Sequence, residues 1–277
     1  MPPDRNKAAR ELLSFYVEAG VDAAIDEQPH DFLSAPEAPA PAERPSRAAA
    51  DAGSAAPPRS PAPRIDTVPA RPAVSPPPAP EAAVMAAREA ARNASSLDEL
   101  RGILDRFEGC SLKGSASRLV FADGTPGSRL MLVGEAPGAE EDRQGLPFVG
   151  RSGQLLDRML AAIGLDRSKV YIANIVPWRP PGNRTPTPVE TQICLPFIKR
   201  QIELCDPDVL ITIGQPSTGA LLGVQGITRN RGRWFPFDTG TREIRAMPML
   251  HPAYLLRTPL AKRQAWRDML AIKKALG

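Results

Sequence analysis

Residues 129–138 read RLMLVGEAPG, and this stretch decides the fold class. The short apolar run at residues 129–133, closed by a glycine and proline turn, is typical of a strand buried inside a sheet. Three more runs of this kind occupy residues 170–176, 209–213 and 244–250. The sequence therefore predicts four buried strands, each followed by a turn.

Helical patterns alternate with these runs, at residues 153–163, 188–204, 217–222 and 260–276. Strands and helices that alternate in this way favour a parallel sheet with helices on both faces. We therefore expect an α/β protein, a three-layer α/β/α sandwich with a central four-stranded parallel sheet, in a domain that spans residues 83–277.

Proline marks a different organisation before this domain. Of the 32 prolines in the chain, 14 lie between Ala35 and Ala82, where Pro, Ala, Ser and Arg dominate. Such a composition cannot bury a core, so residues 35–82 are predicted to form a disordered linker. Residues 1–34 are predicted to form an N-terminal helical segment. Its amphipathic helix, at residues 4–20, is too short to be stable without a partner to dock on.

Charge and composition exclude several classes of protein. Residues 1–97 carry 10 basic and 13 acidic side chains, a net −3, whereas residues 98–277 carry 25 and 18, a net +7. The basic half reflects either a coding bias or a partner whose phosphates meet Lys and Arg. No apolar run approaches the roughly 20 residues that span a bilayer. Three cysteines are too few for a disulfide scaffold, and two histidines, one in each half, exclude a multi-histidine metal site. We expect a monomeric, cytoplasmic protein.

Chemically useful residues follow the predicted strands. Ligands bind beyond the carboxyl ends of the strands in open parallel sheets. The four strands end near Glu135, Asn174, Gly214 and His251. Taken singly, the glutamate could be a solvated loop residue, the asparagine a turn residue and the histidine a strand-end cap. Their joint placement favours a site at this edge of the sheet.

An aromatic residue lies close to the first of these strand ends. Phe148 is framed by glycine and proline in the sequence QGLPFVG at residues 144–150. It could anchor the loop to the core. Alternatively, its planar face could hold a flat heterocycle.

Together these motifs closely resemble family 4 uracil-DNA glycosylases over residues 97–276. The resemblance rests on GEAPG at 134–138, Glu141 and Asp142, GLPFVG at 145–150, Asn174, RPPGNR at 179–184 and HPAYLLR at 251–257. It implies an enzyme of base excision repair that hydrolyses the bond between deoxyribose and uracil in DNA and leaves an abasic site. It also implies uracil-containing DNA as the partner and a nucleoid-associated location.

The resemblance also implies roles for individual residues. Phe148 stacks on the flipped uracil, and Asn174 reads the O4 and N3–H edge of the base. His251 donates a hydrogen bond to O2 as negative charge develops there. Glu135 holds the attacking water or stabilises the cationic sugar. The other residues of the base pocket are Gly134, Ala136, Pro137 and Gly138. Glu141 and Asp142 are the alternative candidates for the catalytic carboxylate. Pro137 or Pro147 is the candidate for excluding the methyl group of thymine.

The DNA contacts are expected from four other parts of the chain. Leu255 or Leu256 is expected to fill the space that the flipped base vacates, and Arg257 to meet a phosphate. Gly214 and Ser217, at the start of a helix, would offer backbone N–H groups to another phosphate. Further contacts are expected from Arg184 and from Arg231, which lies in a loop with Arg229 and Arg233; the alternative for that loop is a solvated surface.

The family's metal cluster is where the sequence departs from the pattern. Family 4 enzymes usually hold a [4Fe-4S] cluster on four cysteines, and this chain keeps only Cys110 and Cys194 as remnants of that site. Phe107 and Trp178 occupy the other two positions, and Cys205 lies about three helical turns beyond Cys194. Because such clusters normally take four thiolates, we predict that no cofactor is bound.

Two other functions are weighed against this one. A non-catalytic or covalent uracil-DNA binder is disfavoured, because residues 144–148 contain neither a basic insertion nor a nucleophilic histidine. An α/β enzyme that acts on a free nucleotide or base is disfavoured by the absence of a Walker lysine or a dinucleotide fingerprint. With DNA repair as the expected setting, the partner of the N-terminal helix is expected to be a replication or repair protein.

Overall fold

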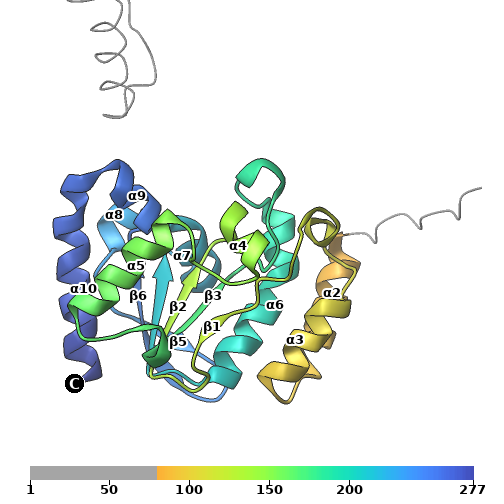
Figure 1. The fold of residues 1–277 in the computed structure, drawn as a ribbon. Coiled ribbons are helices and arrows are strands. Elements are labelled where there is room, and N and C mark those ends of the chain that lie inside the picture. The colour runs from red at the N-terminus through yellow and green to blue at the C-terminus, as the bar shows by residue number, and fades with distance from the viewer. Residues whose placement is uncertain (1–79) are drawn as a thin grey trace, which may run out of the picture. The chain divides into compact units, whose positions relative to one another are not determined.

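A computed structural model describes residues 80–277 (Figure 1). The N-terminal helical segment and nearly all of the predicted linker lie outside these residues. Helix α2 begins at Pro80, so the last three residues of the predicted linker already belong to a helix. Among the described residues, every helix is too short or too polar to cross a membrane.

The centre of the domain is a six-stranded mixed sheet with the order β1-β3-β2-β4-β6-β5. The four inner strands run parallel, and the two outer strands pair antiparallel with their neighbours. The strands are β1 (Asp123–Gly124), β2 (Leu130–Gly134), β3 (Tyr171–Asn174), β4 (Val209–Ile213), β5 (Phe235–Asp238) and β6 (Glu243–Met249).

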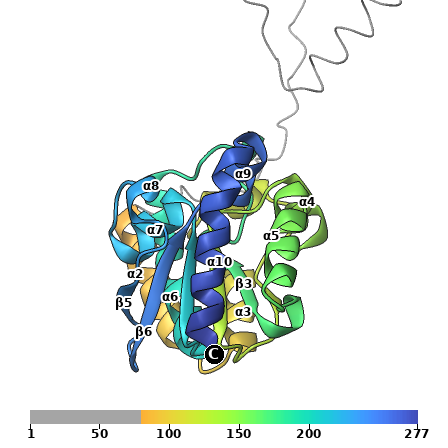
Figure 2. The same cartoon turned by 90° about the vertical axis from the view of Figure 1, so that its left-hand side faces the viewer.

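Helices cover both faces of this sheet (Figures 1 and 2). Met131 and Val133 of β2 pack with helices α2, α3 and α6, whereas Leu130 and Leu132 pack with α5 and α10 on the opposite face. This division follows from the strand itself, because successive side chains point to opposite faces. The helices are α2 (Pro80–Arg92), α3 (Leu97–Arg106), α4 (Ala139–Gln144), α5 (Arg151–Ala162), α6 (Pro188–Cys205), α7 (Gln215–Leu222), α8 (Ile227–Asn230), α9 (Pro252–Arg257) and α10 (Lys262–Leu276).

The predicted three-layer sandwich is confirmed, and its sheet is wider than predicted. The four expected strands form the parallel centre, and β1 and β5 were not anticipated. Strand β1 is only two residues long. Strand β5 has a single buried position among half-buried and exposed ones, so it does not form an apolar run. Their pairing with β3 and β6 therefore depends on the neighbouring strand more than on a pattern of their own.

Candidate active site

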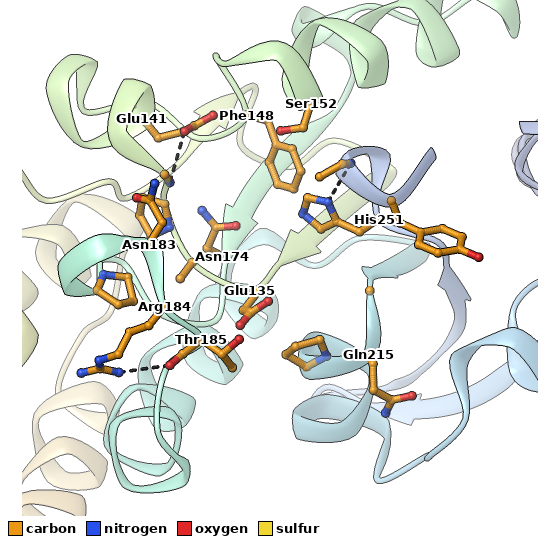
Figure 3. A pocket seen from close by; sticks show the side chains of 18 of the residues that line it. Glu135, Glu141, Phe148, Ser152, Asn174, Asn183, Arg184, Thr185, Gln215 and His251 are labelled. Atoms are coloured by element: carbon orange, nitrogen blue, oxygen red, sulfur yellow. Dashed lines mark hydrogen bonds between the residues drawn. The ribbon is translucent and has the colours of Figure 1, made fainter. Parts of the chain in front are cut away.

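One cavity of about 600 Å³ opens where the parallel strands end. Glu135 follows β2, Asn174 ends β3, Gly214 follows β4 and His251 follows β6, and all four line the cavity together with Phe148 (Figure 3). The structure thus brings together the residues that the sequence placed at one edge of the sheet. Gly138, Ala136 and Pro137 also line this cavity.

His251 presents a defined hydrogen-bond donor to the cavity. Its Nδ1 accepts a hydrogen bond from the backbone N–H of Ala253 at 3.0 Å. Burial, together with the positive charge of Arg257, lowers the pKa of His251 to about 4. The imidazole is therefore neutral near pH 7, and its proton resides on Nε2, because Nδ1 is an acceptor.

Phe148 forms a second wall of the cavity. Its ring stacks on the imidazole of His251, with 5.6 Å between the ring centroids and 27° between the planes. The residue has a positive φ of 54°, which is uncommon for a side chain of this size. A structure must hold such a conformation in place by other contacts.

Those contacts come from Arg167 and Gly153. The guanidinium of Arg167 donates to the carbonyl of Pro147 at 3.1 Å and to the carbonyl of Phe148. The same guanidinium is fixed from behind by Asp157 at 2.8 Å and by an ion pair with Asp123. On the other side, a Cβ at Gly153 would lie only 1.6 Å from the Phe148 carbonyl oxygen, so this close approach requires glycine.

Asn174 faces the Phe148 ring across the floor of the cavity (Figure 3). The residue is only 5% exposed, yet its side-chain amide makes no hydrogen bond to any other residue within 80–277. Its Oδ1 and the Phe148 ring both lie against Gly134, where an added Cβ would be 2.5 Å from Oδ1 and 2.6 Å from Cζ. One amide donor and one amide acceptor are therefore free beside an aromatic face.

Glu135 is the available carboxylate of the cavity. Burial raises the pKa of its side chain, and a hydrogen bond with Thr185 partly offsets that shift. Burial disfavours the charged form of a carboxylate, so Glu135 holds a proton more readily than an exposed glutamate. Thr185 was not among the residues predicted from the sequence.

Glu141 and Asp142 are occupied with the backbone. Oε1 of Glu141 accepts from the N–H groups of Val149 and Gly150 at 3.0 and 2.9 Å, and Oε2 accepts from Gly138 at 3.2 Å. Oδ1 of Asp142 accepts from the N–H of Ser117 at 2.8 Å. Both carboxylates hold loops in place, which favours Glu135 among the three predicted candidates.

The comparisons with known proteins fit this geometry. Residues 121–270 match the family model described as the uracil DNA glycosylase superfamily, which is more than half of the chain. The chain belongs to the uracil DNA glycosylase superfamily. The type-4 uracil-DNA glycosylase of Thermotoga maritima is 40% identical over 149 residues, which cover 53% of this chain and 77% of the relative. The type-4 enzyme of Sulfurisphaera tokodaii is 35% identical over 185 residues, which cover 65% of this chain and 84% of the relative. The type-4 enzyme of Archaeoglobus fulgidus is 33% identical over 66% of this chain and 94% of its own length.

Within this superfamily member, helix α9 carries the segment predicted to meet DNA. This segment forms a short helix that begins directly after His251. Leu255 is fully buried in a small apolar cluster, whereas Leu256 is exposed. Arg257 lies at the rim of the cavity with its side chain exposed. Of the two leucines, Leu256 is therefore the one free to enter DNA.

The other predicted DNA contacts differ in availability. The N–H of Gly214 donates to the carbonyl of Met249 at 2.8 Å, so it is not free for a phosphate. Ser217 is buried, and its hydroxyl donates to the carbonyl of Ile213 at 2.8 Å, which leaves the backbone N–H of Ser217 as the remaining predicted donor.

Two of the predicted arginines are paired with carboxylates. Arg184 binds Glu190 through two hydrogen bonds of 2.8 and 2.7 Å, and this pairing lowers the pKa of Glu190 to about 2. Arg231 donates through Nε to Asp268 at 2.8 Å, and its Nη2 binds the same carboxylate. Arg231 is therefore a structural residue in this conformation, since a phosphate would have to compete with a buried carboxylate for it.

The four residues that the resemblance relates to a metal cluster, two thiols and two aromatic rings, belong to one apolar cluster in the structure. The Sγ atoms of Cys110 and Cys194 lie 4.0 Å apart, and both residues are buried. Trp178 is also buried, and Phe107 makes an edge contact with Phe197 at 5.0 Å between centroids. No group of three or more His, Cys, Asp or Glu side chains within residues 80–277 could hold a metal ion. These residues do not fit a cluster that takes four thiolates.

Sequence reasoning did not find several residues of the site. Arg167 is far from the motifs and acts through the backbone, so its role had no local signal. Thr185 directly follows the RPPGNR motif, and this position is the only sign in the sequence that it belongs to the site. Other cavity residues that were not predicted are Ser152, Pro180, Asn183, Gln215, Pro216, Ala253 and Tyr254.

Proposed function

We propose that the protein hydrolyses the N-glycosidic bond of deoxyuridine in DNA, releasing uracil and leaving an abasic site. The observation that carries this proposal is the meeting of three groups in one cavity. These are the Phe148 ring, the free amide of Asn174 and the neutral, Nε2-protonated imidazole of His251. The type-4 glycosylases to which the chain is similar support the same activity.

Recognition of uracil rests on Phe148 and Asn174. A flipped base can stack on the part of the aromatic ring that lines the cavity, and the amide can donate to O4 and accept from N3–H. Cytosine presents the reverse pattern at these two positions. Its entry would leave buried polar groups unpaired, at a cost of about 1–3 kcal/mol for each group.

Bond cleavage rests on His251 and Glu135. As the bond between C1′ and N1 breaks, its electron pair moves onto the base, and the charge on O2 is stabilised by the Nε2–H donor of His251. The sugar becomes cationic at C1′ and takes up water, whose proton is accepted by the Glu135 carboxylate. Glu135 then releases this proton to solvent and the uracil anion takes one up from solvent, so all atoms and charges balance.

The reaction as proposed needs no metal cluster and no amine nucleophile. Cys110 and Cys194 lie 4.0 Å apart, and the resemblance assigns the other two ligand positions to Phe107 and Trp178, which belong to the same apolar cluster. Iron and sulfide should therefore be absent from protein purified without oxygen. A stoichiometric, stable cluster would contradict this part of the proposal and leave the activity itself untouched.

Contact with DNA is assigned to Leu256 and Arg257 of helix α9, the helix that borders the cavity through Ala253, Tyr254 and Arg257. Leu256 would occupy the space left in the duplex, and Arg257 would bind a phosphate beside the flipped nucleotide. These two roles are proposals of their own, and the exposure of both side chains supports them.

The direct test is excision from uracil-containing single-stranded and double-stranded oligonucleotides. We expect release of free uracil and strand breakage at the abasic site after alkali. Folded protein that releases no uracil would refute the proposal. A heat-stable protein-DNA adduct in place of free uracil would instead indicate a covalent binder.

A further inference from the structure

Helix α10 has an outer face that is basic and apolar at once. Five basic side chains of this helix are exposed, namely Lys262, Arg263, Arg267, Lys273 and Lys274. None of the five forms an ion pair with another residue of the described part of the chain. The only acidic side chain in the helix is Asp268, which is buried against Arg231.

Two large apolar side chains lie within this basic face. Trp266 is 44% exposed and Leu270 is 46% exposed. They are four residues apart, so they lie next to each other on one side of the helix. Ala265, Met269 and Ile272 point to the core instead, so the packing of the helix does not require Trp266 or Leu270.

The helix runs away from the edge of the sheet that holds the cavity. It begins shortly after α9, the helix that borders the cavity, and it ends at the opposite edge. There Arg129, just before β2, donates to the carbonyl of Leu276 at 2.6 Å, and Arg245, near the start of β6, donates to that of Ala275 at 3.1 Å. Figure 2 shows α10 along the side of the domain that is turned to the viewer. DNA bound at the cavity edge would not reach the far half of this face.

We infer that the outer face of α10, formed by Arg263, Trp266, Arg267, Leu270 and Lys274, binds an acidic peptide segment of a partner protein that also carries large apolar side chains. Charge complementarity explains the acidic residues, because the helix exposes five unpaired cations, three of them in this face, and no anion. The exposed pair Trp266 and Leu270 explains the apolar ones, since tryptophan and arginine are both enriched in interface hot spots and Leu270 adds apolar surface beside Trp266. A phosphate backbone would use the cations and leave the apolar pair without a role.

The test uses the full chain and fluorescence anisotropy of a labelled peptide in which Asp and Glu alternate with Phe and Leu. A second peptide has the same acidic residues with Ser in place of Phe and Leu, and a uracil-free DNA duplex serves as a competitor. The variants are Trp266→Ala and Arg267→Glu. Their matched controls are Met85→Ala and Arg88→Glu on helix α2, which packs against α6 on the other side of the sheet.

We expect the Phe/Leu peptide to bind and the Ser peptide to bind at least about tenfold more weakly. Trp266→Ala and Arg267→Glu should each lower the affinity for the Phe/Leu peptide by about tenfold or more, while the α2 controls change it by no more than about twofold. Excision of uracil should be the same in all four variants.

Three results would overturn the inference. The first is no binding of the Phe/Leu peptide, and the second is equal binding of the Ser peptide, which would leave the apolar pair without a function. The third is displacement of the peptide by the duplex together with a matching loss of duplex affinity in Trp266→Ala and Arg267→Glu, which would assign the face to DNA.

Discussion

The substitution Gly134→Ala should disable the site without disturbing the fold. Gly134 ends β2, where its backbone is extended like that of any strand residue, so alanine suits the main chain. The added Cβ, however, would lie 2.5 Å from Oδ1 of Asn174 and 2.6 Å from Cζ of Phe148. Ordinary contact begins at 3.4 Å, so the amide and the ring must each move by about 0.8–0.9 Å.

The expected effect follows from this displacement. A misplacement of about 1 Å in a catalytic site can lower the rate about 10²-fold. The two groups that must move are those assigned to hold and read the base. We therefore expect kcat/KM for uracil excision to fall about 10²-fold, measured under single-turnover and steady-state conditions, with a loss of stability of about 1–3 kcal/mol from overpacking.

Gly114→Ala provides the matched control, because a Cβ at Gly114 meets no atom within 4 Å. Unfolding in denaturant shows whether each variant is folded at the assay temperature. If folded Gly134→Ala excised uracil as fast as Gly114→Ala, the reasoning that joins Gly134, Asn174 and Phe148 into one recognition site would be refuted.

Four further predictions concern single residues of the site. Asn174→Asp should lower kcat/KM on uracil by at least about tenfold, because an ionised carboxylate cannot donate to O4; equal rates on uracil DNA would contradict the assignment, and release of cytosine is the gain to look for. His251→Ala should lower kcat about 10²–10³-fold with a smaller change in DNA affinity, as expected for a donor that acts on developing charge. The pKa of His251 is lowered to about 4 in the folded protein, so its contribution to stability should be complete above about pH 6.5 and should be lost as the pH falls from there through 4. The loss should amount to up to about 3 kcal/mol. If the free energy of unfolding in denaturant changed with pH as steeply in His251→Ala as in the unchanged protein, this prediction would be wrong. Arg167→Ala should raise KM and lower kcat by releasing the Phe148 carbonyl, whereas Arg167→Lys should restore part of both; unchanged kinetics in Arg167→Ala would show that Phe148 needs no such support.

Much of the site was predictable because its signals are local. Apolar runs closed by turn residues identify the four inner strands, and a parallel sheet brings their carboxyl ends to one edge. Glu135, Asn174 and His251 follow from that rule alone. Phe148 was ambiguous between a loop anchor and a stacking ring, and the structure shows it lining the cavity against His251.

The sequence by itself determined the fold class, the edge of the sheet that holds the site and the residues at the ends of its strands. Only the tertiary structure decided which of those groups are free to act. Asp268 pairs with Arg231 across 37 residues, Arg167 reaches the Phe148 carbonyl across 19, and Leu255 is buried while Leu256 is not. The reason is physical: a strand and its turn are specified by neighbouring residues, whereas hydrogen-bond partners, burial and pKa depend on segments that meet only after folding.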